Sequence, residues 1–158
     1  MRTPRILALV GWAAWLGCAT EKPAGPQAKS FDVALTKDAE VAVCAGAGAA
    51  AKGMATVTVS ADGSSVTAMV TYSGLSGDPT ASHIHAGAAG ANGPVVLPFG
   101  APLTSPYSKT FTAADYQANP GAPPDFAAFV TALRAGGAAY INIHTAACKP
   151  GELRGEIQ

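Results

Sequence analysis

The stretch GMATVTVSADGSSVTAMVTYS, residues 53–73, decides the expected fold of this chain. Its two arms, 53–60 and 65–73, place apolar residues at every second position. A period of two is typical of β-strands that bury one face. The pair Asp62-Gly63 lies between the arms, and Asp-Gly supplies the positive φ angles that a tight hairpin requires. We therefore expect residues 53–73 to form a β-hairpin.

Short β-type segments continue on both sides of this hairpin, separated by turns rich in glycine and proline. We expect further strands at residues 31–35, 81–86, 95–98, 107–111, 139–144 and 152–157. One short helix is expected near 125–135, because Asp125 is a good N-cap residue and the apolar residues after it follow helical spacing. Many short strands with little helix indicate a mainly β fold, an antiparallel β-sandwich or a barrel-like single domain.

The N-terminal region has the features of an export signal over residues 1–18. Two arginines, Arg2 and Arg5, precede an uninterrupted apolar stretch that is too short for a good membrane span. The end of this stretch, Leu16-Gly17-Cys18, resembles a lipobox, although Trp15 stands where leucine is usual. Lipidation at Cys18 and ordinary secretion both remain open. Residues 19–30 contain two prolines and no large apolar side chain, so we expect a flexible tether before a domain at 31–158.

The charge and the cysteine content limit which cellular compartment and which partners we expect. Ten basic residues balance ten acidic ones, and no basic run follows Arg5, which argues against a nucleic-acid partner. Membrane contact is expected only through a lipid anchor. If Cys18 carries lipid, Cys44 and Cys148 remain and can form a disulfide outside the cytoplasm. The alternative is that they are two buried thiols.

All three histidines of the chain lie in two short segments, SHIH at 82–85 and YINIHT at 140–145. If the isoleucines of these segments face the core, alternation places His83 and His85 on one face, and Asn142 and His144 on the corresponding face. The last strand repeats the pattern. It adds three charged side chains to that face: Glu152, Arg154 and Glu156. We therefore expect three imidazoles, an amide, two carboxylates and a guanidinium on one surface.

Five motifs carry a family resemblance. They are SGL (73–75), ASHIHAG (81–87), GANGPVVL (90–97), YINIHT (140–145) and PGELRGEI (150–157). Through them the chain resembles the CHRD (chordin-type) domain from about residue 31 to 158, in a protein of the exported or lipoprotein type found in bacteria. One departure is the segment 41–44 (VAVC), where the family often has a Val-Pro-Pro stretch. The resemblance implies a β-rich extracellular module, and it does not imply growth-factor binding.

Three interpretations of the polar face stay open. In the first, its side chains form a structural hydrogen-bond network with the 87–94 loop, in which Arg154 pairs with Glu152 or Glu156. In the second, neutral imidazoles hold a Zn or Cu ion, with three ligands: His83, His85 and His144. In the third, the loops 87–94 and 100–106 bind an unknown protein of the envelope or the extracellular space.

Catalysis is not expected. The sequence contains neither a Gly-x-Ser-x-Gly nucleophile motif nor a glycine-rich phosphate loop. Apart from the candidate Zn or Cu ion, no cofactor is expected. The sequence thus favours an exported structural or partner-binding module, with extracytoplasmic metal binding as the alternative.

Overall fold

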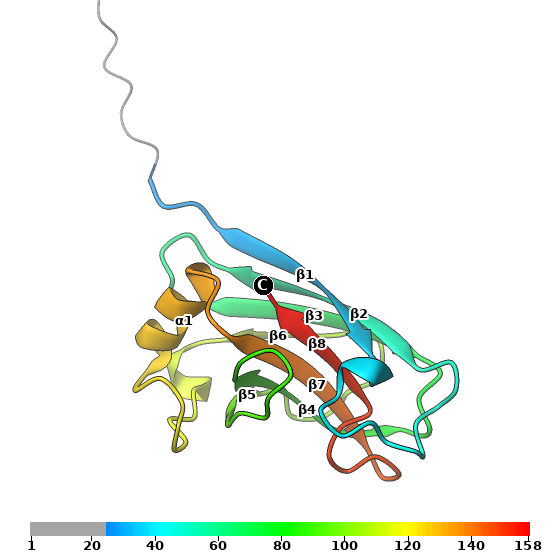
Figure 1. Ribbon diagram of the computed structural model, residues 1–158. Helices are drawn as coiled ribbons and strands as arrows, with labels where there is room; N and C mark the ends of the chain where they lie inside the picture. The colour runs from blue at the N-terminus through cyan, green and yellow to red at the C-terminus, as the bar shows by residue number, and fades with distance from the viewer. Residues whose placement is uncertain (1–24) are drawn as a thin grey trace, which may run out of the picture.

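The computed structural model describes residues 25–158, so the expected export signal, Cys18 and the first part of the tether lie outside the described residues. Eight antiparallel strands form one nearly closed, barrel-like sheet in the order β5-β4-β7-β8-β1-β2-β3-β6 (Figure 1). The strands are β1 (Lys29–Thr36), β2 (Lys52–Val59), β3 (Val66–Ser73), β4 (Pro79–Ala86), β5 (Val95–Pro98), β6 (Tyr107–Phe111), β7 (Ala139–Thr145) and β8 (Leu153–Ile157). The expected mainly β fold with one short α-helix is confirmed.

The β2–β3 hairpin pairs along its whole length, from Lys52 opposite Ser73 to Val59 opposite Val66. Its turn contains Gly63 at a φ of 73°, the positive value for which glycine was expected. Asp62 stabilises the same turn, because its carboxylate accepts hydrogen bonds from Ser60 and Ser64. These hydrogen bonds lower the pKa of Asp62 to about 2. The alanines and valines of both arms line the core, whereas the polar residues and the two methionines, Met54 and Met69, face outward.

One end of the barrel is covered by the helix α1 (Phe126–Arg134) (Figure 1). The side chain of Asp125 accepts a hydrogen bond from the backbone N–H of Ala128, as expected for an N-cap. The apolar face of α1 packs into the core with four buried residues: Phe126, Phe129, Val130 and Leu133. Arg134 donates to the carbonyls of Ser60 and Ala61, which fixes the helix to the turn of the β2–β3 hairpin.

The other end of the barrel holds a disulfide between Cys44 and Cys148, whose Cα atoms are 5.7 Å apart. The expected pairing of these two cysteines is therefore confirmed. The bond joins positions 104 residues apart, and the chain-entropy model gives on the order of 4 to 5 kcal/mol for a loop of that length. Two 3-10 turns, η1 (Lys37–Ala39) and η2 (Ala113–Asp115), complete the described elements.

Six of the eight strands begin or end one or two residues away from the expected positions, and two of these differences have a clear cause. Strand β1 begins at Lys29, two residues early, because Lys29 and Ser30 continue the pairing with β2. Strand β8 begins at Leu153 instead of Glu152, because the chain bends at Glu152 and turns its side chain toward neighbouring loops. Among residues 25–158, no helix has the length and apolar character needed to cross a membrane.

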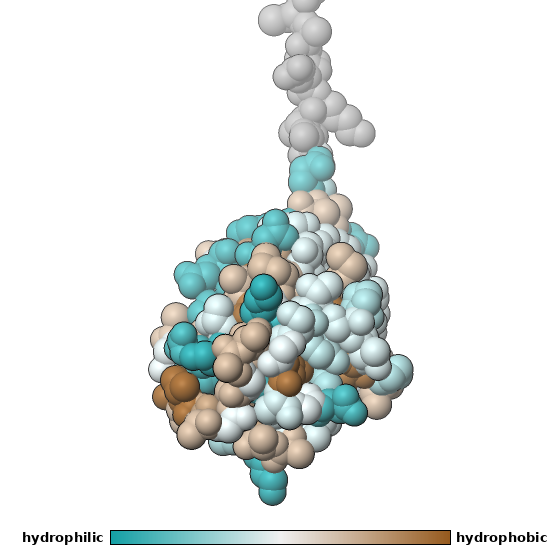
Figure 2. Space-filling model, turned by 90° about the vertical axis from the view of Figure 1, so that its right-hand side faces the viewer, coloured by the Kyte–Doolittle hydropathy of each residue, from teal (hydrophilic) through white to brown (hydrophobic). Residues whose placement is uncertain are grey.

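The described surface carries few large exposed apolar side chains. They are Val41, Val43, Met54 and Met69. On the face drawn in Figure 2, strongly hydrophobic residues lie in small separate groups among pale and hydrophilic ones. That face therefore offers no broad apolar area of the kind that marks an obligate protein interface.

Candidate metal centre

The polar motif residues lie on three adjacent strands in the middle of the sheet, β4, β7 and β8. Across these strands His83 lies opposite Asn142, and Asn142 lies opposite Arg154. The isoleucines beside them are fully buried in the barrel: Ile84, Ile141 and Ile143. Because side chains alternate along a strand, the polar residues project from the outer side of the sheet.

This outer side is nevertheless covered, because the 87–94 loop folds back over it. His85 is 8% exposed, Asn142 is 3% exposed and Arg154 is fully buried. The loop approaches the sheet so closely that a Cβ atom on Gly93 would lie 1.8 Å from the carbonyl oxygen of Ala86. Only glycine fits there, which gives a physical reason for this residue in the GANGPVVL segment.

Arg154, Tyr140 and His85 form a stack under the loop. The guanidinium carbon of Arg154 lies 3.4 Å from the centre of the Tyr140 ring. The other face of Tyr140 stacks on His85, with ring centres 4.5 Å apart and planes inclined by 11°. Arg154 also pairs with Glu156 at 2.9 Å and donates to the carbonyl of Ala91 at 2.9 Å. The buried cation therefore connects the sheet, the stack and the covering loop.

The hydrogen bonds of His85 define its tautomer. Its Nδ1 lies 2.8 Å from the carbonyl oxygen of Gly93, and because a carbonyl can only accept, Nδ1 carries the proton. Burial lowers the pKa of His85, although the hydrogen bonds to Gly93 and Asn142 act in the opposite direction. A neutral His85 therefore has its lone pair on Nε2, which lies 3.2 Å from Oδ1 of Asn142. When the side-chain amide of Asn142 is rotated by 180°, its NH2 group takes the place of Oδ1 and donates to Nε2 of His85.

His144 is held in the same way by a second loop. Its Nδ1 lies 2.8 Å from the carbonyl oxygen of Lys149 and therefore donates to it. The lone pair of a neutral His144 is then on Nε2, which lies 3.3 Å from Nδ1 of His83. Burial is the largest cause, and together with the neighbouring His144 and His85 it lowers the pKa of His83 to about 4. At neutral pH His83 is consequently uncharged.

The three imidazoles converge to the spacing of a metal site. His83, His85 and His144 each offer one ring nitrogen, and these nitrogens all lie within 4.8 Å of one another. Ligands of a tetrahedral zinc ion, at about 2.0–2.1 Å from the metal, lie about 3.3–3.4 Å from each other. The His83–His144 separation of 3.3 Å already has this value, and the His85 nitrogen lies within 4.8 Å of both.

Glu152 does not join this cluster. Its carboxylate accepts hydrogen bonds from the backbone of Gly48, from Ser76 and from Thr145, at the disulfide end of the barrel. Burial acts to raise its pKa, but these hydrogen bonds outweigh burial, and the pKa of Glu152 is lowered. The expected face therefore gathers one carboxylate, Glu156, instead of two, and Arg154 pairs with Glu156 alone.

Two residues of the site were missed by sequence reasoning. Tyr140 lies on the same face of β7 as Asn142 and His144, so the alternation of side chains along this strand could have identified it. Glu40 gave no such signal, although it is 7% exposed and lies against Gly151, where a Cβ atom would be 2.2 Å from the Oε1 atom of Glu40. The pKa of Glu40 is raised to about 7, because the effect of burial and of Glu156, which both raise it, outweighs that of Arg154, which lowers it.

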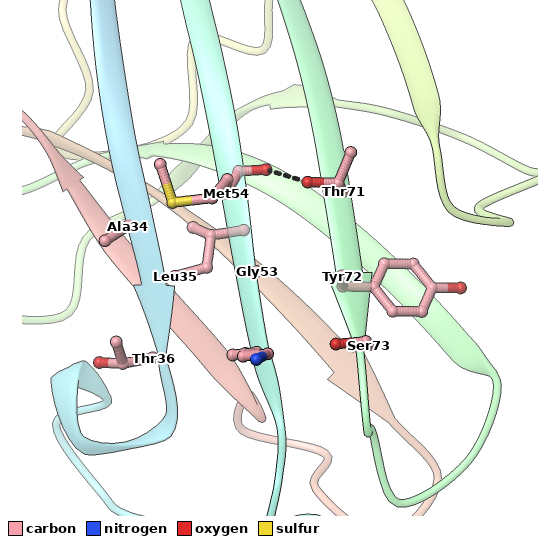
Figure 3. A pocket seen from close by; sticks show the side chains of 9 residues that line it. Ala34, Leu35, Thr36, Gly53, Met54, Thr71, Tyr72 and Ser73 are labelled. Atoms are coloured by element: carbon pink, nitrogen blue, oxygen red, sulfur yellow. Dashed lines mark hydrogen bonds between the residues drawn. The ribbon is translucent and has the colours of Figure 1, made fainter.

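A hollow of about 520 Å³ lies on the outer side of β1, β2 and β3 (Figure 3). Gly53, Met54 and Tyr72 are among the residues that line it. Its lining contains one charged residue, Lys52, and none of the titratable clusters that support chemistry. The histidine cluster is therefore the stronger candidate site.

Comparisons with known proteins give one family. The model of the CHRD domain matches residues 31–157. No curated protein and no solved structure matches the chain. The matched range begins in β1 and ends at the last residue of β8, so it includes every residue of the histidine cluster and its covering loop.

Proposed function

The chain belongs to the CHRD domain family, and from this premise we propose that it is an exported, non-catalytic module of the cell envelope whose histidine cluster binds a Zn(II) or Cu(II) ion. Its export, and its anchoring through lipid on Cys18, rest on the features of residues 1–18. The Cys44–Cys148 disulfide supports an oxidising compartment, because such bonds are rare in the cytoplasm of most organisms.

One observation carries the metal proposal. His85 and His144 each donate Nδ1–H to a backbone carbonyl at 2.8 Å, which leaves Nε2 of each neutral ring as the nitrogen that carries the lone pair. Metal-binding histidines almost always have such a partner on the nitrogen that does not bind the metal, because it fixes the tautomer and the ring orientation. The Gly93 and Lys149 carbonyls supply these partners on two separate loops.

The ligand chemistry favours a late first-row metal. Neutral imidazole nitrogens suit Zn(II) and Cu(II), whereas Mg(II) and Ca(II) prefer oxygen ligands. The low pKa of His83, about 4, keeps this ligand unprotonated well below neutral pH. A water molecule or a ligand from a partner protein completes the coordination, since the described cluster supplies three histidines.

The test is metal titration of protein purified without an affinity tag and stripped with a chelator. We expect one equivalent of Zn(II) or Cu(II) to bind, with nitrogen hyperfine coupling in the Cu(II) spectrum. The His83→Ala and His144→Ala variants should bind the metal much more weakly, through the two remaining histidines, whereas the matched control Lys52→Ala, on another part of the sheet, should bind like the wild type. Equal binding by the histidine variants and the wild type would refute the site.

A second candidate, a purely structural network, is supported by the Arg154–Tyr140–His85 stack. On this account, His85→Ala and Arg154→Ala lower the melting temperature, and added metal leaves the melting temperature of the wild type unchanged. Metal binding instead predicts that the wild type melts higher with Zn(II), because an ion that binds only the folded state stabilises that state.

A further inference from the structure

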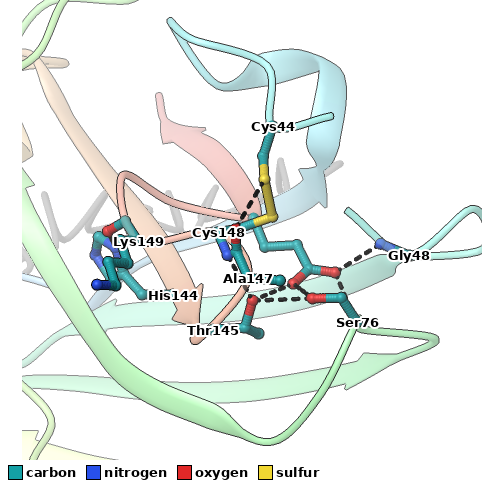
Figure 4. Close-up of a disulfide and its surroundings, with 9 residues drawn as sticks. Cys44, Gly48, Ser76, His144, Thr145, Ala147, Cys148 and Lys149 are labelled. Atoms are coloured by element: carbon teal, nitrogen blue, oxygen red, sulfur yellow. Dashed lines mark hydrogen bonds between the residues drawn. A yellow bond between two sulfur atoms is a disulfide. The ribbon is translucent and has the colours of Figure 1, made fainter. Parts of the chain in front are cut away.

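The loop that orients His144 is the loop that contains one half of the disulfide. Lys149, whose carbonyl accepts the Nδ1–H of His144, directly follows Cys148 in the hairpin between β7 and β8. Figure 4 shows His144 and Lys149 on one side of this loop, with the disulfide and the Thr145–Ser76 contacts on the other. A single peptide unit thus connects the Lys149 carbonyl, which orients His144, to the disulfide at Cys148.

The disulfide acts together with hydrogen bonds inside the loop. The Thr145 N–H lies 3.4 Å from the Cys148 carbonyl, the Cys148 N–H lies 3.2 Å from the Thr145 carbonyl, and the Gly151 N–H lies 3.2 Å from the Cys148 carbonyl. The side chain of Lys149 is exposed. The bond to the Cys44 sulfur is the covalent restraint on the segment that carries the Lys149 carbonyl.

The other two ligands do not depend on this loop. The carbonyl that orients His85 belongs to Gly93, in the loop that Arg154 fixes through Ala91. His83 lies on the interior strand β4, which pairs with β7 on one side and with β5 on the other. A change at the disulfide therefore acts on one ligand of three.

We propose that the Cys44–Cys148 disulfide regulates the metal affinity of the histidine cluster, acting through the Lys149 carbonyl that orients His144. This inference rests on the proposed function. When the disulfide is reduced, the loop and its carbonyl move away from Nδ1, and the ring of His144 becomes free to rotate. Loss of a single outer-shell partner typically weakens metal binding about 10–100-fold.

The reducing agent is a dithiol protein or small molecule. Its thiolate attacks the sulfur of Cys44, which is partly exposed, and the buried Cys148 sulfur leaves as a thiolate. The second thiol of the reductant then breaks the mixed disulfide. Two electrons and two protons pass from the dithiol to the protein, which yields two cysteine thiols and an oxidised reductant.

The test compares Zn(II) affinity in full-length mature protein with and without the cross-link. The double variant Cys44→Ala/Cys148→Ala removes the bond without adding thiol ligands, and we expect its affinity to fall about 10–100-fold. In a His144→Ala background, the same double substitution should cause no further loss, because the coupling passes through His144. An equal fold-loss in both backgrounds, or no loss in either, would overturn the proposal.

A second measurement covers the case in which the double variant folds poorly. The wild type is reduced with a phosphine, its thiols are alkylated, and the imidazole nitrogens are observed by NMR without metal. We expect His144 to lose its hydrogen-bonded Nδ1–H while His85 keeps its own. Unchanged His144 signals would contradict the inference. If the oxidised wild type binds no Zn(II) or Cu(II), the proposed function itself fails, and that outcome differs from binding that is insensitive to the disulfide.

Discussion

Replacing Glu40 by glutamine should change how the stability of this protein depends on pH. Glu40 is buried against Gly151, and its Oε1 atom has no hydrogen-bond partner among the described residues. Burial raises its pKa from 4.5 to about 7. The folded state therefore holds this proton more tightly than the unfolded state does. The resulting stability is fully present below pH 4.5 and is lost as the pH rises to about 7.

The size of this effect follows from the shift. One pKa unit corresponds to about 1.4 kcal/mol, so a rise from 4.5 to about 7 contributes about 3 kcal/mol to the free energy of unfolding when Glu40 is fully protonated in both states. His83 acts in the opposite direction, because its pKa falls from 6.5 to about 4. Its contribution is lost as the pH falls from 6.5 toward 4, and partial exposure to solvent makes it smaller. The two effects overlap and largely cancel in the wild type.

The Glu40→Gln variant removes the contribution of Glu40 to the pH dependence and keeps that of His83. Compared with the wild type, we expect it to have similar stability near about pH 4 and to be more stable by about 3 kcal/mol near about pH 8. Urea unfolding of both proteins across this range, with a chelator present, measures the difference while all other titrations cancel. His83→Gln is the matched control, since its difference from the wild type should change with pH in the opposite sense. A Glu40→Gln difference that is the same at both ends of the range would refute the reasoning.

Three further predictions concern the covering loop, the buried cation and the anchor. Gly93→Ala should destabilise the domain by about 2–3 kcal/mol in thermal unfolding, because the new Cβ meets the carbonyl of Ala86; a change within error would contradict this. Arg154→Met should cost about 3–5 kcal/mol in urea unfolding, since it leaves Glu156 without its partner, and a double change with Glu156→Gln should recover part of the loss. Cys18→Ser should move the protein from the membrane to the soluble fraction, and an unchanged membrane fraction would argue against lipidation.

The sequence predicted the strands and their faces well because both depend on local patterns. The alternation in residues 53–73 determines which side chains enter the core, and the Asp62-Gly63 pair determines where the hairpin turns. The same parity argument places His83, His85, Asn142 and His144 on one side of the sheet. The choice between a sandwich and a barrel was beyond reach, because it depends on how strands far apart in the chain pair with one another.

The remaining features of the site arise from long-range contacts. Alternation showed which face carries the histidines, but not that the 87–94 loop covers this face and buries Arg154. Glu152 was placed with the cluster because its spacing to Arg154 is two residues, yet the chain bends before β8 and the carboxylate turns away. Glu40 has no local pattern at all, since only the fold brings it against Gly151.

The two ends of the barrel are closed by bonds of different kinds. At one end, the covalent Cys44–Cys148 link and the several hydrogen bonds to Glu152 join three loops. At the other end, α1 is held by its apolar face and by Arg134. Spontaneous opening should therefore start at the helix, where amide hydrogens exchange fastest and proteases cut first. The strands that carry the histidines would then stay paired near the disulfide while the helical end opens and closes.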